Sequence, residues 1–186
     1  MSRVKAIKEE QAPPEVQEIY GKIQNNGAKI INLYRTLAHN PRVLRDFLRL
    51  GSSLLSKSEL SPKLRELAIL RVAKLTGSEY EWRQHHSIAL EVGVTAEQAE
   101  IVSDWHGSDL FSSEERAVLQ YTDEVTQNVE PRDETYRALQ QYLNDQNIVE
   151  LTVSIGYWGM VARILVALQV DIDYRTVSSG KELFGK

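Results

Sequence analysis

Residues 61–92 read SPKLRELAIL RVAKLTGSEY EWRQHHSIAL EV, and this stretch decides the fold. Ser61 suits the N-cap of a helix and Pro62 suits its first turn, and an almost continuous apolar run follows them. Gly77 interrupts the run, and a second helix is expected over about 78–92. The sequence therefore predicts two consecutive helices joined by a tight turn.

The remainder of the chain shows the same helical pattern on both sides of this pair. No segment alternates apolar and polar residues for long enough to predict a strand. Asn40 is an expected N-cap, and Thr95 with Gln98 has the capping-box pattern. Further helices are expected over 13–25, 30–38, 41–55, a short segment after Thr95, 113–128, 133–144 and 148–170. The predicted fold class is all-α.

The chain of 186 residues is long enough for one domain with its own core. We expect a polar, loosely held arm over residues 1–12, a helical domain over 13–172 and a C-terminal tail over 173–186. The helices that begin at 41 and 62 resemble those that begin at 113 and 147. An internal duplication and a similarity due to helix packing alone both remain open.

Composition excludes several classes of function. The chain has no cysteine, so disulfides, thiolate nucleophiles and thiolate metal sites are ruled out. With 22 basic and 26 acidic side chains and no basic stripe, no nucleic-acid partner is expected. No apolar run follows the N-terminal residues, and Glu150 and Arg163 interrupt the most apolar stretch, 148–170. We expect that stretch to be a core helix, with no signal peptide, no membrane span and a cytoplasmic location.

The pair formed by Glu81 and His85 is the first candidate for chemistry. Their spacing of four residues on a helix allows the two side chains to meet. A carboxylate beside an imidazole raises the pKa of the ring, orients it and provides the minimum equipment for proton transfer. The same spacing is also typical of a solvated helix face. Glu66 is a second candidate, although a carboxylate near a helix start is also explained by the helix dipole.

No metal or cofactor is expected from these residues. His85 and His86 point about 100° apart on a helix, so they do not easily share one ion, and no HExxH spacing occurs. No GxSxG elbow is present either. Tyr80, Trp82 and Trp105 are interpreted as core or pocket-wall residues.

The stretch from Glu66 to Trp82, with His85 and the following 93–95, resembles the carboxymuconolactone decarboxylase family, which includes alkylhydroperoxidase D. Looser similarity extends upstream to residues 40–41 and downstream to 109–124 and 156–158. The resemblance implies an alkylhydroperoxidase D-like helical fold. It also implies a homo-oligomer, a trimer or hexamer, with sites near the contacts between subunits.

The peroxidase branch of this family carries a glutamate, a Cys-x-x-Cys pair and a histidine. The glutamate corresponds to Glu66 and the histidine to His85, whereas the two cysteine positions hold Ser78 and Glu81. Thiol peroxidase chemistry needs a thiolate to attack the peroxide and a second thiol to resolve the product. Neither serine nor glutamate can do this, so we do not expect thiol peroxidase activity. The protein could still remove peroxide by a route that needs no thiol, and a peroxide-consumption assay without added metal would test this alternative.

The decarboxylase branch does not depend on cysteines, and the resemblance implies loss of carbon dioxide from a carboxylated unsaturated lactone without a cofactor. We therefore expect a decarboxylase, lactone-processing enzyme or isomerase acting on a small carboxylated metabolite. His85 is the expected proton donor, and Glu81 is expected to adjust the pKa of its ring. Glu66 is expected to orient the ring, and Arg71 to bind the substrate carboxylate. The further pocket candidates are Ser78, Tyr80, Trp82 and His86. The alternative is a binding or scaffold relative without catalysis, whose site would be closed by packing.

Overall fold

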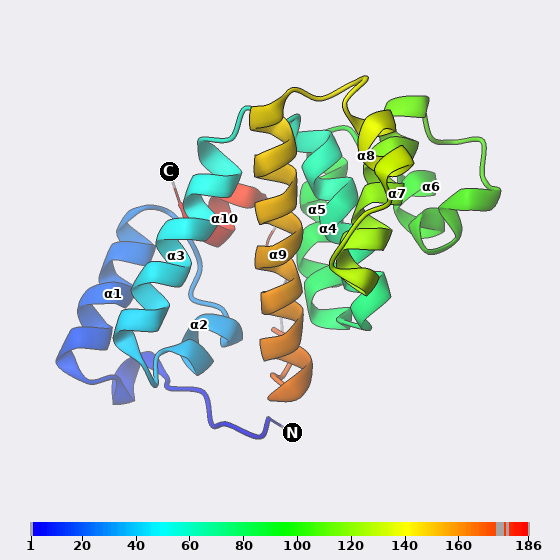
Figure 1. The fold of residues 1–186 in the computed structure, drawn as a ribbon. Coiled ribbons are helices and arrows are strands. Elements are labelled where there is room, and N and C mark those ends of the chain that lie inside the picture. The colour runs from blue at the N-terminus through cyan, green and yellow to red at the C-terminus, as the bar shows by residue number, and fades with distance from the viewer. Residues whose placement is uncertain (1, 174–176, 178, 186) are drawn as a thin grey trace.

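The computed structural model describes residues 2–173, 177 and 179–185, and these residues form α- and 3-10 helices without any strand (Figure 1). The all-α prediction is therefore confirmed. The α-helices are α1 Pro14–Asn25, α2 Asn32–Leu37, α3 Pro41–Ser56, α4 Pro62–Thr76, α5 Glu79–Glu91, α6 Ala96–Ile101, α7 Ser113–Asn128, α8 Asp133–Leu139, α9 Asp145–Ala167 and α10 Gly180–Phe184, and the 3-10 helices are η1 Glu9–Gln11 and η2 Val102–Gly107.

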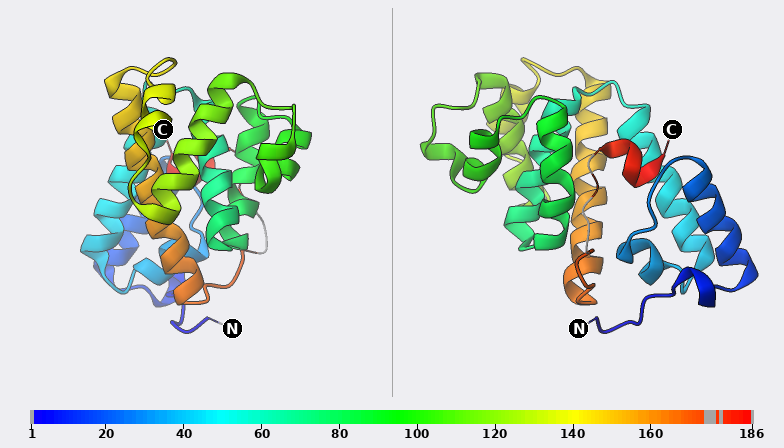
Figure 2. Two further views of the ribbon diagram at one scale, coloured as in Figure 1. Left: turned by 45° about the vertical axis from the view of Figure 1, so that its right-hand side comes forward. Right: turned by 180° about the vertical axis from the view of Figure 1, so that it is seen from behind.

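Helix α4 is the centre of the fold because it packs against α5, α7 and α9. All ten residues from Leu64 to Ala73 are buried, which explains the almost continuous apolar run in this part of the sequence. Helices α1–α3 lie on one side of α9 and helices α6–α8 on the other, as both the front and rear views show (Figures 1 and 2). The larger hydrophobic cluster joins α1–α5, α7 and α9, and a smaller one joins α4 to α6, η2 and α7.

Local sequence signals account for most helix boundaries. Asn40 caps α3 by accepting from the Val43 N–H, and Thr95 forms the expected capping box. Gly77 ends α4 in the left-handed conformation, at φ 66°, which glycine adopts without the cost that a Cβ brings. Ser61 differs from expectation because its side chain makes no capping hydrogen bond.

The helix predicted over 133–144 is shorter than expected. It ends at Leu139, and the chain then turns, because Asn144 is the N-cap of α9 and accepts from the Asn147 N–H at 2.9 Å. A residue that caps the following helix has an extended backbone and cannot also continue the preceding helix. Helix α9 accordingly begins at Asp145 rather than at Ile148.

The two chain ends are tied to the domain. The Arg3 N–H donates to the Leu168 carbonyl at 2.8 Å, and the Ile7 N–H donates to the Arg35 carbonyl at 3.1 Å. The prediction of a loosely held N-terminal arm is therefore wrong for residues 2–12. In the predicted tail, α10 packs against α3, and the Tyr34 hydroxyl donates to the Leu183 carbonyl at 2.7 Å. Residues 174–176, 178 and 186 of that tail lie outside the described residues.

Helix α9 is long and apolar enough to cross a membrane by length and composition alone. Its most apolar window is 56% buried inside the protein, and Leu151, Trp158 and Leu165 on it are almost inaccessible. The core helix of a folded domain also meets this length and hydropathy criterion, so the criterion is weak evidence for a membrane-spanning helix. The burial of α9 inside the protein agrees with its expected role as a core helix.

Gly51 of α3 marks the closest approach between α3 and the C-terminal helix. A Cβ at this position would lie 2.3 Å from Cε1 of Phe184 and 2.4 Å from the Tyr157 hydroxyl oxygen. Gly51→Ala is therefore expected to lower the free energy of unfolding by about 1–3 kcal/mol through overpacking. Denaturant unfolding would measure the change.

Gly21→Ala in α1 is the matched control, because a Cβ there meets nothing within 4 Å. It is expected to raise stability by about 0.5–1 kcal/mol, the helix-propensity difference between alanine and glycine. Equal effects of the two substitutions would contradict the close packing of Phe184 on Gly51.

Candidate functional site

A cavity with apolar walls lies where α2, α3, α5, α9 and α10 meet. The centre of a water-sized sphere can move within about 20 Å³ of it, which is room for roughly one water molecule. Four aromatic rings besides Tyr80 and Trp158 contribute to its walls, and its carboxyl and imidazole groups come from α5. The lining residues are Ile31, Leu33, Tyr34, Phe47, Tyr80, Glu81, Gln84, His85, Tyr157, Trp158, Val161, Leu165, Leu183 and Phe184.

His85 is held on both sides of its ring. Its Nδ1 lies 2.8 Å from Oε2 of Glu66, and the Trp158 indole N–H donates to its Nε2 at 2.8 Å. An indole nitrogen can only donate, so Nε2 must be the acceptor, and Nδ1 then carries the proton that is donated to Glu66. The contacts therefore select the neutral imidazole with its proton on Nδ1.

Glu66 connects this histidine to a buried arginine. Glu66 is completely inaccessible to solvent, and its Oε1 lies 3.6 Å from Nε of Arg65. Arg65 is also buried, with 4% of its surface exposed. Burial lowers the pKa of Arg65, whereas the Glu66 carboxylate opposes this change. Arg65, Glu66, His85 and Trp158 thus form a continuous buried polar chain from α4 through α5 to α9.

Glu81 is the unusual group of the cavity. Its side chain is buried, and neither carboxyl oxygen has a hydrogen-bond partner among the described residues. Burial raises its pKa well above the usual 4.5, and Ser78 opposes this effect more weakly without a hydrogen bond of normal geometry. An apolar pocket favours the neutral acid because the carboxylate loses its hydration there. Glu81 therefore lines the cavity in surroundings that favour its protonated form.

The expected pairing of Glu81 with His85 is wrong. Both ring nitrogens of His85 bond to other side chains, on α4 and α9, which leaves no nitrogen for Glu81. The spacing along α5 places the two residues on one side of the helix, but residues of the helices packed against α5 form the hydrogen bonds with His85. Glu66, by contrast, makes the expected contact with the histidine.

Arg71 is absent from the cavity lining, and its predicted role as the carboxylate anchor is wrong in this geometry. It is buried elsewhere, where Nη2 donates to Oδ2 of Asp123 at 3.0 Å and Nε donates to Oδ1. Its Nη1 donates to the carbonyls of Val102 and Ser103. Arg71 thus ties α4 to α7 and η2 and is fully engaged in the structure.

The other predicted pocket residues divide into two groups. Tyr80 lines the cavity, where its hydroxyl donates to Asp173 and accepts from the Leu33 N–H. Ser78, Trp82 and His86 are not among the lining residues. Ser78 is the buried N-cap of α5. Lys74 Nζ lies 4.1 Å from the centroid of the Trp82 ring, and the His86 ring is tilted against Trp82 with the two centroids 4.8 Å apart. Nε2 of His86 lies 3.5 Å from Oε1 of Glu100.

Sequence reasoning missed most of the aromatic wall. Tyr34, Phe47 and Tyr157 come from three helices, and Phe184 comes from the segment that was expected to be a tail. No local pattern identifies them, since a buried aromatic residue at helical spacing looks the same in a cavity wall as in the core. The 156–158 stretch was noted only as part of the family resemblance.

No three His, Asp or Glu side chains are grouped closely enough to hold a metal ion within the part of the chain that the structure describes. The chemistry that the described site can offer by itself is proton transfer. A carboxyl group whose pKa is raised by burial lines the cavity, as does an imidazole that is held in a fixed orientation.

Residues 41–124 match the carboxymuconolactone decarboxylase family, and this stretch contains Glu66, Glu81 and His85. Over this stretch, the chain is similar to that family. The matched residues comprise α3 to most of α7, so they include α4 and α5 but not α9, which completes the site. The family resemblance inferred from Glu66, the Gly77 turn and His85 is therefore confirmed, while the roles of these residues in catalysis stay predictions.

This chain is similar to several known proteins in sequence or in fold. The uncharacterized protein YdfG of Bacillus subtilis is 26% identical over 114 residues, which cover 60% of this chain and 78% of YdfG. An uncharacterized peroxidase-related protein of Ralstonia eutropha, described as an alkylhydroperoxidase AhpD core, superposes with a TM-score of 0.81 at 18% identity, covering 97% of this chain and 96% of its own. A cysteine-to-alanine variant of the debrominase Bmp8 in complex with 2,3,4-tribromopyrrole superposes with a TM-score of 0.75 at 21% identity, covering 92% and 91%.

Proposed function

We propose that this protein is an acid–base enzyme that transfers a proton to or from a small, largely apolar, ring-shaped substrate, with Glu81 as the acid. The observation that carries the proposal is the buried Glu81 carboxyl, which lines an aromatic cavity and has no hydrogen-bond partner among the described residues. An uncompensated buried polar group costs roughly 1–3 kcal/mol of stability, so its presence in a cavity suggests a role in function.

The proposed step uses Glu81 as donor and acceptor in turn. In an isomerisation, the acid would protonate one carbon of an unsaturated ring, and the carboxylate so formed would take a proton from another carbon, so that no net proton is consumed. In a decarboxylation, the electron pair of the breaking C–C bond would pass to the ring, Glu81 would protonate the resulting carbanion, and solvent would return the proton. In a lactone hydrolysis, a water molecule would add to the carbonyl carbon, the ring C–O bond would break, and the same acid would protonate the leaving oxygen while solvent takes up the proton of the water.

His85 has a positioning role in this proposal. Its Nε2 lone pair is occupied by the Trp158 N–H and its Nδ1 by Glu66, so proton transfer through His85 would require one of these bonds to break. We infer that Glu66 and Trp158 fix the ring as a wall of the site, next to the acid on the same helix. This differs from the sequence-based expectation, which had His85 as the donor.

The nature of the cavity bears on the substrate. Among the described residues, its lining has no lysine or arginine, and Arg71 is paired with Asp123 elsewhere. A free carboxylate on the substrate would therefore lie in an apolar site without a counter-ion, which is unfavourable. We therefore propose that the substrate is a neutral ring, such as an unsaturated lactone, rather than a carboxylated metabolite. The complex of Bmp8 with a tribromopyrrole supports a small planar ring as a ligand for this fold.

The experiment is a screen of the purified protein against unsaturated five-membered lactones, with and without a carboxylate, followed by ultraviolet absorbance and carbon dioxide release. Turnover of a neutral lactone would support the proposal. Consumption of peroxide without added metal would instead favour a route independent of thiols, and turnover of only the carboxylated lactones would restore the decarboxylase interpretation.

A binding or scaffold protein without catalysis is the second candidate. Two observations favour it: both nitrogens of His85 are hydrogen-bonded, and the cavity has room for roughly one water. Ligand binding without turnover, measured by calorimetry on the same lactones, would support this candidate over the enzyme. A homo-oligomeric state and a cytoplasmic location remain predictions.

Phe184 is the proposed barrier to the cavity. It lines the cavity and also two surface hollows, one of about 250 Å³ between α1 and α3 and one of about 460 Å³ beside α4 and α5. A ligand larger than water must displace a wall residue, and Phe184 is the residue common to all three spaces. Phe184→Ala is therefore expected to raise the association rate constant of a cavity ligand by about tenfold or more, because gated binding is slower than free encounter.

Stopped-flow tryptophan fluorescence with a lactone that binds would measure this rate. Phe111→Ala is the matched control, because Phe111 is a buried ring of the smaller hydrophobic cluster and does not line the cavity. If both variants bind at the parental rate, passage beside Phe184 is refuted, whatever the outcome of the screen.

A further inference from the structure

A surface hollow of about 460 Å³ lies outside the cavity, between the end of α3, the start of α4, the end of α5 and α10. Its size is within the roughly 300–1,000 Å³ that small-molecule sites occupy. The proposed reaction does not use it, although it shares Phe184 with the cavity. We call it the Arg65 hollow, and the residues in its lining that bear on ligand binding are Leu55, Arg65, Ile88, Val92, Lys181 and Phe184.

Arg65 is the unusual group of this hollow, because it is buried and yet makes few hydrogen bonds. Only 5% of its side chain is exposed. Its Nη1 donates to the Leu54 carbonyl at 3.2 Å, whereas its Nε lies 3.6 Å from Oε1 of Glu66, which is too far for a hydrogen bond. No further hydrogen bond of this guanidinium is found among the described residues. Since a buried donor without a partner is unfavourable, the remaining N–H groups of Arg65 indicate a ligand.

Arg71 provides a comparison within the same helix. It is also buried, but its guanidinium donates to both carboxylate oxygens of Asp123 and to the carbonyls of Val102 and Ser103. Its N–H groups are therefore taken up by the protein. Arg65 has no carboxylate at hydrogen-bond distance, so an anion that enters the hollow can supply what Asp123 supplies to Arg71.

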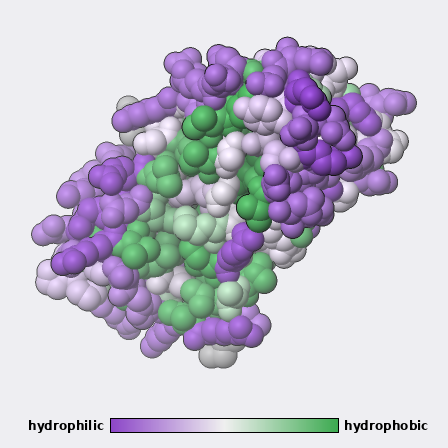
Figure 3. Space-filling view, viewed as in Figure 1, coloured by the Kyte–Doolittle hydropathy of each residue, from purple (hydrophilic) through white to green (hydrophobic). Residues whose placement is uncertain are grey.

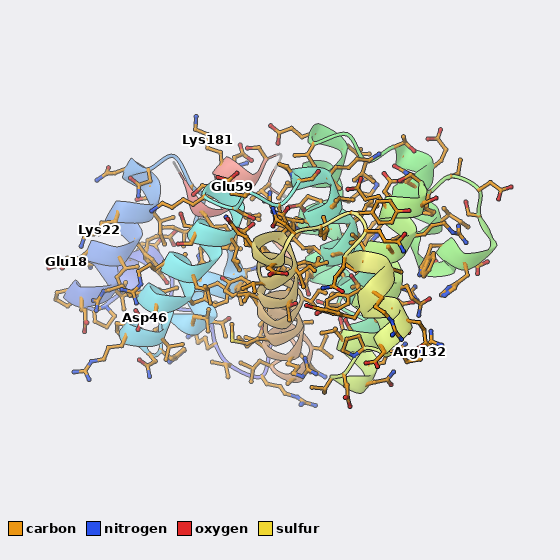
Figure 4. All side chains as sticks on the ribbon, turned by 45° about the horizontal axis from the view of Figure 1, so that its top comes forward. Glu18, Lys22, Asp46, Glu59, Arg132 and Lys181 are labelled. Atoms are coloured by element: carbon orange, nitrogen blue, oxygen red, sulfur yellow. The ribbon has the colours of Figure 1, made fainter. Side chains whose placement is uncertain are left out.

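Two further features favour a negative charge in the hollow. Pro62, in the first turn of α4, lines it, so the positive end of the α4 dipole lies there, and this turn contains no acidic residue. Lys181 also lines the hollow. It is exposed, and Figure 4 shows it extending outward from α10. Its charge therefore attracts an anion toward the hollow, while Arg65 is the buried group that would bind it.

Acidic groups near Arg65 limit the charge that the ligand can carry. Glu66 faces its Nε, and Glu150 also interacts with it electrostatically. Glu91 lines the hollow itself. A dianion such as a phosphate monoester would be repelled by these carboxylates, whereas the guanidinium matches the single charge of a carboxylate.

The rest of the wall is largely apolar. Leu55 comes from α3, Ile88 and Val92 from the end of α5, and Phe184 from α10. Apolar surface alone does not identify a ligand site, since Figure 3 also shows hydrophobic surface over α9 and its border with α3. The distinguishing feature of the hollow is a buried cation beside apolar walls. This combination suits a ligand with an apolar body and one anionic group.

We propose that the Arg65 hollow binds a small monocarboxylate with a compact apolar body, whose carboxylate accepts hydrogen bonds from the Arg65 guanidinium. The planar guanidinium matches the geometry of a carboxylate, and charge-assisted hydrogen bonds are stronger than neutral ones. The apolar body would pack against Leu55, Ile88 and Phe184. The site goes beyond the proposed function, because it lies outside the cavity that contains Glu81.

Isothermal titration calorimetry of the full chain with benzoate tests the inference, with benzyl alcohol and phenyl phosphate as comparison ligands. Benzoate is expected to bind, and benzyl alcohol to bind about tenfold or more weakly, because it cannot form charge-assisted hydrogen bonds. Phenyl phosphate is expected to bind more weakly than benzoate. Arg65→Lys keeps a positive charge beside Glu66 but loses the planar fork, so it is expected to raise the dissociation constant of benzoate by about tenfold or more.

Three further variants make the result specific. Lys181→Glu changes an exposed charge of the hollow and should weaken benzoate binding several-fold. Arg83→Lys on α5, an exposed arginine outside the hollow, is the matched control and should bind benzoate as the parent does. Glu81→Gln should also retain parental affinity for benzoate, because Glu81 lines the cavity and not the hollow. Binding in the hollow is thereby separated from the proposed reaction, whose failure would leave these affinities unchanged.

Circular dichroism and thermal unfolding would show whether each variant is folded. If Arg65→Lys is not, Lys181→Glu and the comparison ligands still decide the question. Absence of benzoate binding at millimolar concentration, equal affinity for benzoate and benzyl alcohol, or tighter binding of phenyl phosphate would each overturn the inference. Loss of benzoate binding in Glu81→Gln would place the ligand in the cavity and overturn it as well.

Discussion

Glu81→Gln is expected to reduce turnover of an accepted substrate by about 10²- to 10⁴-fold, the usual contribution of a positioned general acid. Glutamine has nearly the same shape and can still hydrogen-bond, but it cannot release a proton at neutral pH. The comparison therefore separates proton transfer from filling of the cavity. Steady-state kinetics with the lactone found in the screen would measure the loss.

Two further variants make this result specific. Glu91→Gln on the same helix is exposed and should retain parental turnover. His85→Gln should reduce turnover less than Glu81→Gln if the histidine positions rather than donates. A Glu81→Gln protein as active as its parent would refute the role of Glu81. A larger loss with His85→Gln would return the proton transfer to the histidine.

The same residue should show the opposite effect on stability. Glu81→Met removes a buried polar group without partners among the described residues and is expected to stabilise the fold by about 1–3 kcal/mol. Because burial raises the pKa of Glu81 above 4.5, the native state holds a proton that the unfolded chain releases as the pH rises. The contribution of Glu81 to the free energy of unfolding therefore falls as the pH rises from the pKa of Glu81 in the unfolded chain toward its higher pKa in the native state. The advantage of Glu81→Met, measured by denaturant unfolding, should widen as the pH rises above 4.5.

Asp123→Ala is expected to lower the free energy of unfolding by about 3–5 kcal/mol, the usual cost of leaving a buried charge unpaired. Asp123 accepts two hydrogen bonds from Arg71 and one from the Trp105 indole at 3.1 Å. Without it, a buried guanidinium would retain only the two carbonyls of η2. Thermal unfolding should show a decrease of roughly 6–20 °C in the midpoint.

Asp109→Ala, in an exposed turn, is the control and should change stability by less than about 0.5 kcal/mol. The double variant Arg71→Met with Asp123→Leu removes both charges and should be more stable than Asp123→Ala alone. An Asp123→Ala protein of parental stability would contradict the structural role of Arg71. It would also reopen the earlier interpretation of Arg71 as a substrate anchor.

Local chemistry predicted the helices well because the signals act within a turn or two. Asn40, Thr95 and Gly77 each satisfy a backbone group a few residues away, so their roles can be read in sequence. The end of α8 was misplaced because Asn144 serves the following helix, and α10 was missed because a five-residue helix has too little pattern. Internal duplication stays a prediction.

The sequence by itself determined the helical class, the family and the absence of thiol chemistry, since these follow from composition and from short-range spacing. Only the tertiary structure decided the partners of the candidate site residues. His85 lies four residues from Glu81 but bonds to Glu66, 19 residues away, and to Trp158, 73 residues away. Arg71 similarly pairs with Asp123, 52 residues away. A helix fixes which residues share a face, but the helices packed against that face supply the hydrogen bonds. For this reason Glu81 has no hydrogen-bond partner among the described residues, although it lies on the same helix as His85.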